Sequence, residues 1–202
     1  MFFNDNVISK KWFIGIFTIK VLVSVALTLI YTYYYTDRST ADIFKYFDDS
    51  KIMFEAIKTN PLDFFKMLFG VANDSSYFNE TYYDKMRFWY SQGSTNLFTD
   101  SHTIIRFNAI VHFFSFGYFN VHNVFINFVS LIGLTAIFNI VKPYFKAYEK
   151  VVFYAIFLAP SVLFWGSGLL KESIIFFGLG LLLLNLKQLS EKFSWQSILF
   201  IL

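Results

Sequence analysis

Long apolar runs alternate with one extended polar segment along this chain. The apolar runs cover residues 12–35, 124–141, 151–165 and 173–186, and another begins at 195–202. A helix needs about 20 mainly apolar residues to cross the hydrocarbon core of a membrane. The pattern therefore predicts an all-α, polytopic transmembrane protein, with a large outer loop carrying interfacial helices after its first span.

The polar segment, residues 37–100, contains ten of the fourteen acidic residues. Its first part has the apolar spacing of an amphipathic helix over residues 41–58. Ser39 or Thr40 is expected to cap this helix, because small hydroxyl side chains favour that position.

A second short helix is predicted directly after the first one. Asn60 is expected as its cap, Pro61 as its first residue and Gly70 as its end. About ten residues are too few to cross a membrane. This apolar helix is therefore expected to lie in the membrane interface.

The acidic residues of the predicted helix 41–58 lie on two different sides of its apolar stripe. At about 100° per residue, Asp42 and Asp49 fall on one flank of the apolar stripe, with Lys45 close by. Asp48 and Glu55 fall on the other side, where solvent is expected. Asp42 and Asp49 are thus predicted to face one site.

Charge next to the apolar runs indicates topology. Lys10 and Lys11 precede the first span, so the positive-inside rule places the N-terminus in the cytoplasm and the polar segment outside. If the stretch 103–118 crosses the membrane, the lysine-containing loop 142–150 falls outside, against this rule. If that stretch is re-entrant or interfacial, the loop is inside, and the turn 166–172 shares a side with the polar segment. Both versions stay open.

Composition supports the membrane class, at 56% hydrophobic and 23% aromatic residues. The net charge of +3 is small, and many lysines lie beside apolar runs, so nucleic acid is not indicated as a partner. The absence of cysteine excludes disulfides and thiolate metal sites. Because the last apolar run has only begun at Leu202, we expect the N-terminal part of a longer protein, with a short hydrophobic tail as the alternative.

Several residues have both a structural and a functional interpretation. Lys20 lies inside the first span. We expect its side chain to snorkel to the interface or to bind a partner on a neighbouring helix, and we favour these roles over a functional one. His102, His112 and His122 are expected in hydrogen-bonded structural roles rather than in one metal site. The aromatic residues of 71–100 can stack on sugars, but a membrane-interface belt or a small core under the loop is the favoured interpretation.

Asp42 followed by Tyr46, in a large outer loop after the first span, resembles the GT-C class of membrane glycosyltransferases. Enzymes of this class place an acidic residue in that loop, often with a tyrosine a few positions later. The stretch 159–172, APSVLFWGSGLLKE, is also similar to part of bacterial surface-polysaccharide polymerases. The resemblance implies a membrane glycosyltransferase or polysaccharide polymerase of the bacterial inner (plasma) membrane.

The resemblance implies a polyprenyl-linked sugar as donor and a saccharide or a lipid as acceptor, in contact with membrane lipids. Asp42 is then the general base that activates the acceptor hydroxyl, with Asp49 in reserve. Arg106 and Lys171 would hold the phosphate leaving group. The remaining substrate contacts would be Tyr46 and Glu172. No cofactor is indicated with certainty, and a divalent metal ion stays an open option.

Plainer roles exist for the same residues. Asp42 and Asp49 can form a salt-bridged helix flank with Lys45, and Arg106 can anchor a helix at the interface. Glu172 suits the positive end of a helix dipole. The rival function is a non-catalytic membrane protein, either a transporter or flippase fragment or a complex subunit whose loop binds a partner.

Overall fold

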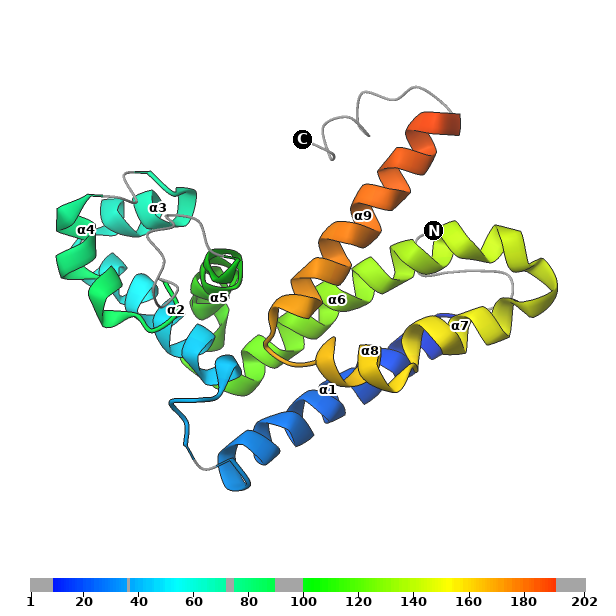
Figure 1. Ribbon diagram of the computed structural model, residues 1–202, viewed down its shortest axis with the longest axis horizontal. Helices are drawn as coiled ribbons and strands as arrows, with labels where there is room; N and C mark the ends of the chain where they lie inside the picture. The colour runs from blue at the N-terminus through cyan, green and yellow to red at the C-terminus, as the bar shows by residue number, and fades with distance from the viewer. Residues whose placement is uncertain (1–8, 36, 72–74, 90–99, 192–202) are drawn as a thin grey trace. The chain divides into compact units, whose positions relative to one another are not determined.

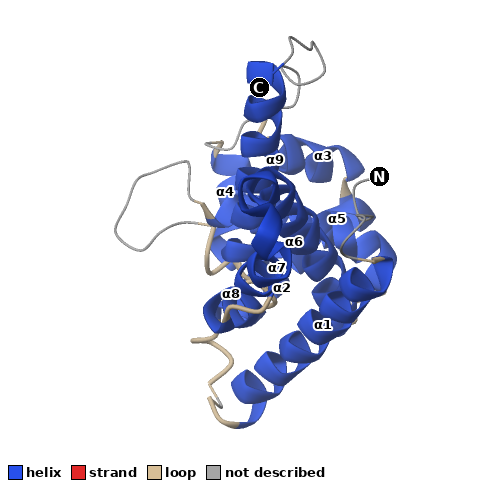
Figure 2. Cartoon of the chain, turned by 90° about the vertical axis from the view of Figure 1, so that its right-hand side faces the viewer, coloured by secondary structure: helices blue, strands red, loops and turns tan. Residues whose placement is uncertain are grey.

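A computed structural model describes residues 9–35, 37–71, 75–89 and 100–191 of the chain. Within these ranges the backbone forms α-helices, two short 3-10 helices and no strand (Figure 2), so the all-α prediction is confirmed. The apolar run predicted to begin at 195–202 lies outside the described residues. In chain order the helices are α1 (Lys10–Tyr33), α2 (Asp42–Thr59), α3 (Pro61–Phe69), α4 (Ser76–Thr81), η1 (Tyr83–Lys85), α5 (Ser101–Ser115), α6 (Phe119–Val141), η2 (Lys142–Tyr148), α7 (Glu149–Phe157), α8 (Pro160–Trp165) and α9 (Lys171–Glu191) (Figure 1).

Three helical stretches in the described ranges are long and apolar enough to cross a membrane: α1, the stretch Phe119–Phe157 and α9. The 24 residues of α1 rise about 36 Å, compared with a hydrocarbon core of about 30 Å. The stretch 103–118 lies mainly in α5, which has 15 residues, rises about 22 Å and is not among the three. The run 151–165 is divided between α7 and α8, because α8 begins at Pro160, whose missing N–H suits a first helical turn.

The chain divides into two compact units. The first unit comprises Met1–Leu27, Asn123–Gly168 and Glu172–Leu202. The second comprises Thr28–His122 and Leu169–Lys171. It therefore contains the polar segment, residues 37–100, which we call the acidic segment from here on, together with the first residue of α9.

Aromatic side chains form the core of the first unit. Phe13 of α1 packs edge-on against Phe153 and Phe157 of α7, with ring centroids 5.8 Å apart in both pairs. Phe138 of α6 meets the same two rings, so α7 runs back beside α6 (Figure 1). Edge-to-face packing adds specific geometry to the burial of these large side chains.

Two glycines allow α6 and α9 to approach each other closely. A Cβ atom added at Gly133 would collide with the backbone of Phe176 and Phe177, and one added at Gly180 would collide with the backbone of Gly133. Small residues are favoured at helix crossings in membranes because they permit such backbone contact.

The second unit is organised around α2, which packs mainly against α5 and α3. The start of α2 differs from the prediction: its N-cap is Ala41, with no side-chain cap bond. Ser39 and Thr40, which were expected to cap the helix, stabilise the preceding turn instead. The Ser39 hydroxyl donates to Asp37 Oδ1 at 2.6 Å, and the Thr40 hydroxyl donates to the Asp37 carbonyl at 2.9 Å.

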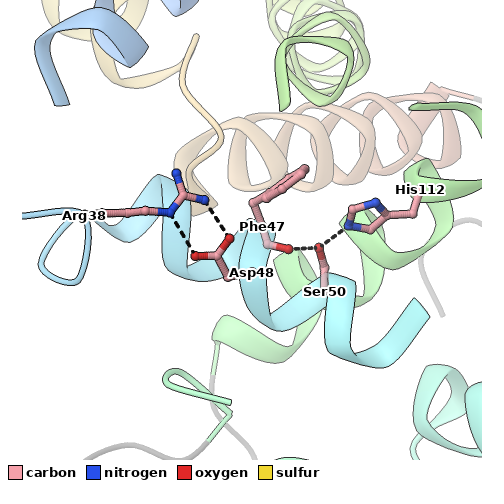
Figure 3. Close-up of polar contacts among 5 residues, drawn as sticks. All are labelled: Arg38, Phe47, Asp48, Ser50 and His112. Atoms are coloured by element: carbon pink, nitrogen blue, oxygen red, sulfur yellow. Dashed lines mark hydrogen bonds and ion pairs between the residues drawn. The ribbon is translucent and has the colours of Figure 1, made fainter. Parts of the chain in front are cut away.

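The buried face of α2 includes much of the predicted stripe, together with residues outside it. Met53 and Ala56 are buried on this face, whereas Phe54 and Ile57 are only half-buried. On the other side, Asp48 is half-exposed and accepts hydrogen bonds from Arg38 at 2.7 and 3.2 Å (Figure 3).

The short helix α3 follows its prediction closely. Asn60 Oδ1 accepts the Leu62 N–H at 3.2 Å, Pro61 is the first helical residue, and Gly70 ends the helix with a φ of 73°. That left-handed conformation is the one in which glycine has no Cβ penalty.

An aromatic core lies between the end of the acidic segment and α5. Trp89 stacks on Tyr83 at 4.3 Å and on His102 at 3.9 Å, and His102 Nε2 lies 2.6 Å from the Trp89 carbonyl. All three side chains are buried. Tyr83 and Trp89 of the segment 71–100 therefore belong to a small core, which is one of the two structural roles that the sequence favoured over sugar stacking.

Candidate functional site

Lys171, Tyr46 and Asp42, three of the predicted site residues, belong to one polar cluster of the second unit. Asp42 is the first residue of α2, Lys171 is the first residue of α9, and Asp100 is the N-cap of α5. Lys171 Nζ lies 2.6 Å from Asp100 Oδ2, and its positive charge also acts on the Tyr46 hydroxyl. We call these residues, with Lys45, the Lys171 cluster.

Tyr46 is the buried member of the Lys171 cluster, with 1% of its surface exposed. Its ring lies 5.2 Å from that of Phe88, and Ser101 and Lys171 are among the groups that act on its hydroxyl. Burial raises the pKa of Tyr46, while the positive charge of Lys171 opposes this rise. The phenol is therefore a neutral, fixed hydrogen-bonding group beside the lysine.

Asp42 is the accessible carboxylate of the cluster. Its side chain is 52% exposed, and Lys45 Nζ lies 3.8 Å from its Oδ1. At the first position of α2, the negative charge is favoured by the helix dipole. Asp42 can thus receive a ligand from solvent without breaking a buried contact.

Asp49 has a different environment from Asp42, although both were predicted to face one site. It is 1% exposed, and its two oxygens accept the backbone N–H groups of Arg87 and Phe88 at 2.9 and 2.7 Å. Burial raises the pKa of Asp49, although both hydrogen bonds act in the opposite direction. Its carboxylate holds the 87–88 backbone, which makes it a poor general base.

Arg106 is oriented toward α3. Its Nε donates to the Met67 carbonyl at 3.0 Å, and its guanidinium lies 5.4 Å from the Trp89 ring centroid. The Nη2 atom is buried without a hydrogen-bond partner among the described residues. Arg106 lies six residues after Asp100, about 9 Å along the axis of α5.

Glu172 belongs to the first unit, whereas the Lys171 cluster belongs to the second. It is exposed and lines a mainly apolar cavity of about 380 Å³. The other lining residues are Ser161, Val162, Trp165 and Phe176.

The sequence interpretation did not single out Asp100 and Ser101 as site residues. A local signal was present, because an Asp-Ser pair directly before an apolar stretch is typical of a helix start. Their role depends on Tyr46 and Lys171, which are distant in the sequence, so pattern alone does not reveal it.

His112 and His122 take part in buried hydrogen bonds. His112 Nε2 lies 3.1 Å from Ser50 Oγ, whose hydroxyl donates to the Phe47 carbonyl at 2.7 Å (Figure 3). His122 lies within 2.9 Å of both Asn108 and Ser115. Among the residues that the structure describes, no three His, Asp or Glu side chains are grouped to hold a metal ion.

A groove of about 610 Å³ runs along the far end of α2. Tyr77 and Tyr82 form part of its wall, and both donate their hydroxyls to Asp63 Oδ2, at 2.8 and 3.0 Å. Asp63 is itself buried, so both rings are held in place. Burial raises the pKa of Tyr82 to about 12. Also lining the groove are Ile52, Glu55, Ala56, Thr59, Asn60, Thr81 and Lys85.

Comparison with known proteins finds no protein-family model, no curated protein and no solved structure that matches this chain.

Proposed function

We propose that this chain is part of a membrane glycosyltransferase or polysaccharide polymerase that uses a polyprenyl-linked sugar at the outer face of a bacterial inner membrane. The observation that carries the proposal is the Lys171 cluster. It combines an exposed carboxylate, a buried phenol and a lysine where α2, α5 and α9 begin. Helix N-termini and a lysine together favour a phosphate group.

In the proposed reaction, the Asp42 carboxylate accepts the proton of an acceptor hydroxyl while that oxygen attacks the anomeric carbon of the donor sugar. The bond from this carbon to the phosphate oxygen breaks, and the polyprenyl phosphate leaves with the electron pair. A new glycosidic bond forms, and the released proton remains on Asp42.

Lys171 would bind the leaving phosphate. Its present partner, Asp100, has a side chain 73% exposed. Exposed ion pairs of this kind contribute little stability. A doubly charged phosphate can therefore replace Asp100 at Lys171 at low cost, while Tyr46 keeps the ammonium in position.

The contacts of Lys171 also support one of the two topologies. Asp100, Tyr46 and Lys171 lie in one unit, which is the arrangement expected if the start of α9 is on the same side of the membrane as the acidic segment. This is the version in which the stretch 103–118 does not cross, and α5 is too short to do so.

The groove along α2 supports a saccharide acceptor. The exposed Tyr77 ring offers a face for sugar C–H groups, and Asn60, Thr59 and Glu55 offer hydrogen-bonding groups. Asp42 and Glu55 are thirteen residues apart, about 20 Å along α2. The groove would therefore hold an acceptor chain at a distance from its reacting end.

The direct test is Asp42→Asn in the full-length protein. Loss of the general base should lower sugar transfer by about 100-fold or more. The assay is incorporation of radiolabelled sugar into polymer by membranes that contain equal amounts of each variant. The matched control is Asp84→Asn, an exposed aspartate of η1 outside the cluster. Normal transfer by Asp42→Asn would refute the assignment.

A non-catalytic role is the second candidate, and the pairing within the cluster favours it. Asp42 lies against Lys45, and Asp100 pairs with Lys171, so the four charges already compensate one another. This candidate predicts that Asp42→Asn has no effect on transfer. It predicts instead that substitution of the exposed Tyr77 changes assembly with a partner.

A further inference from the structure

Polar side chains from three helices gather at the break between α8 and α9, within the first unit. The Gly166 carbonyl, at the end of α8, accepts hydrogen bonds from Lys20 Nζ at 2.6 Å, Ser130 Oγ at 2.9 Å and Ser173 Oγ at 3.0 Å. Buried backbone carbonyls in native proteins are paired with hydrogen-bond donors, and three side chains serve this one carbonyl. The break is therefore a built polar site.

Lys20 is the charged group of this site. It is the eleventh residue of α1 and fully buried. Its Nζ also lies 3.2 Å from Ser167 Oγ, whose hydroxyl donates to the Leu163 carbonyl and so accepts from the lysine. Burying an ammonium inside a membrane helix is costly, and such residues mark functional sites by default.

Neutral oxygens surround the Lys20 ammonium. Its hydrogen-bond partners are the Gly166 carbonyl and the Ser167 hydroxyl, and within the described ranges none of its hydrogen bonds or ion pairs reaches a carboxylate. Carbonyl and hydroxyl oxygens in this arrangement replace the hydration shell of a monovalent cation. The C-terminal end of α8 adds the negative end of a helix dipole.

Asn127 brings a further polar side chain to the break between α8 and α9. Its Nδ2 donates to the Ser167 carbonyl at 2.9 Å, which places the side chain at the break. Its Oδ1 is buried and has no hydrogen-bond partner among the described residues. A buried acceptor left unpaired is costly, so this atom points to a ligand or to a second position of the lysine.

We propose that the oxygens of Gly166, Ser167 and Asn127, with the hydroxyls of Ser130 and Ser173, form a monovalent-cation site whose resident cation is the Lys20 ammonium. The lysine ties α1 to the α8–α9 break as a tethered ligand. Removal of the ammonium exposes a site that a small free cation can fill. This site is separate from the Lys171 cluster, and the proposal does not depend on glycosyl transfer.

The first test uses Lys20→Ala in the full chain, purified in detergent, with the melting temperature as the readout. In N-methylglucamine chloride, which is too large to enter, the variant should melt roughly 5 °C or more below wild type. Sodium, potassium or ethylammonium chloride at the same ionic strength should restore part of this loss in a saturable way. Wild type and the exposed control Lys11→Ala should melt equally in all four salts.

Two outcomes of this test would overturn the proposal. One is that no small cation raises the melting temperature of Lys20→Ala above its value in N-methylglucamine. The other is that wild type responds to the same cations equally, which would place the effect elsewhere. Adding Ser130→Ala and Ser173→Ala to Lys20→Ala should remove the response.

A second variant keeps the proposal testable if Lys20→Ala does not fold. The chain has no cysteine, so Lys20→Cys carries a unique thiol. Reaction with 2-aminoethyl methanethiosulfonate restores an ammonium at nearly the original length, whereas ethyl methanethiosulfonate adds a neutral chain of similar size. The proposal requires a higher melting temperature for the ammonium adduct, and equal values for the two adducts would contradict it.

Discussion

At the scale of residues, burial distinguishes the two carboxylates that helical spacing places on one flank of α2. Asp42 is half-exposed, whereas Asp49 is enclosed because the backbone of residues 87–88 returns to cover it. A carboxylate that accepts two backbone N–H groups stabilises a segment, and one open to solvent can exchange a proton with a substrate. We therefore propose a chemical role for Asp42 and a structural role for Asp49.

This division predicts a stability effect for Asp49. Asp49→Ala leaves two partly buried N–H groups without an acceptor, which should destabilise the fold by about 1–3 kcal/mol. The melting temperature in detergent should fall by roughly 2–10 °C. Asp48→Ala, which removes only the exposed pair with Arg38, is the control and should change it little. Equal effects of the two substitutions would contradict the structural role of Asp49.

The sequence separation between a residue and its hydrogen-bond partner explains which roles could be predicted from the sequence. Asp49 binds the N–H of Arg87, 38 residues away, and Lys20 binds Gly166, 146 residues away. Helical periodicity describes only neighbours within a few turns, so it placed Asp49 on the correct helix but did not show what covers it. For Lys20, the sequence suggested a partner on a neighbouring helix, without its identity.

At the scale of elements, the sequence predicted a helix end correctly where that end is determined by the residues at the end itself. Asn60, Pro61 and Gly70 set the ends of α3 as predicted. The prediction that Ser39 or Thr40 caps α2 was wrong, because both hydroxyls donate hydrogen bonds to Asp37 in a turn before the helix begins. The continuous span expected at 151–165 is broken before Pro160, where the proline removes a backbone donor.

The contact of α6 with α9 gives a prediction at the same scale. Gly180→Ala places a methyl group against the Gly133 backbone, so the helices must separate. Overpacking of this kind costs about 1–3 kcal/mol. Gly178→Ala is a matched control on the same helix, because nothing lies within 4 Å of its added Cβ. The melting temperature in detergent should fall for Gly180→Ala only, and an equal response of both variants would argue against the close crossing.

At the scale of the whole molecule, membrane topology is the property on which the proposed function depends. Composition and apolar runs predicted a membrane protein, and three helical stretches in the described ranges have the required length and apolarity. The positive-inside rule favoured the topology in which the stretch 103–118 does not cross the membrane, but both topologies stayed open. The contact of Lys171 with Asp100 and Tyr46 favours the one in which α9 begins beside the acidic segment.

The central claim is that Lys171 and the acidic segment act together at the outer face, and cysteine labelling tests it most directly. Single cysteines at the exposed positions Glu80, Lys146 and Glu172 suit this chain, which has no native cysteine. A membrane-impermeant maleimide applied to intact cells should label Glu80→Cys and Glu172→Cys but not Lys146→Cys until the cells are opened. Labelling of positions 80 and 146 in intact cells, with position 172 protected, would contradict the account.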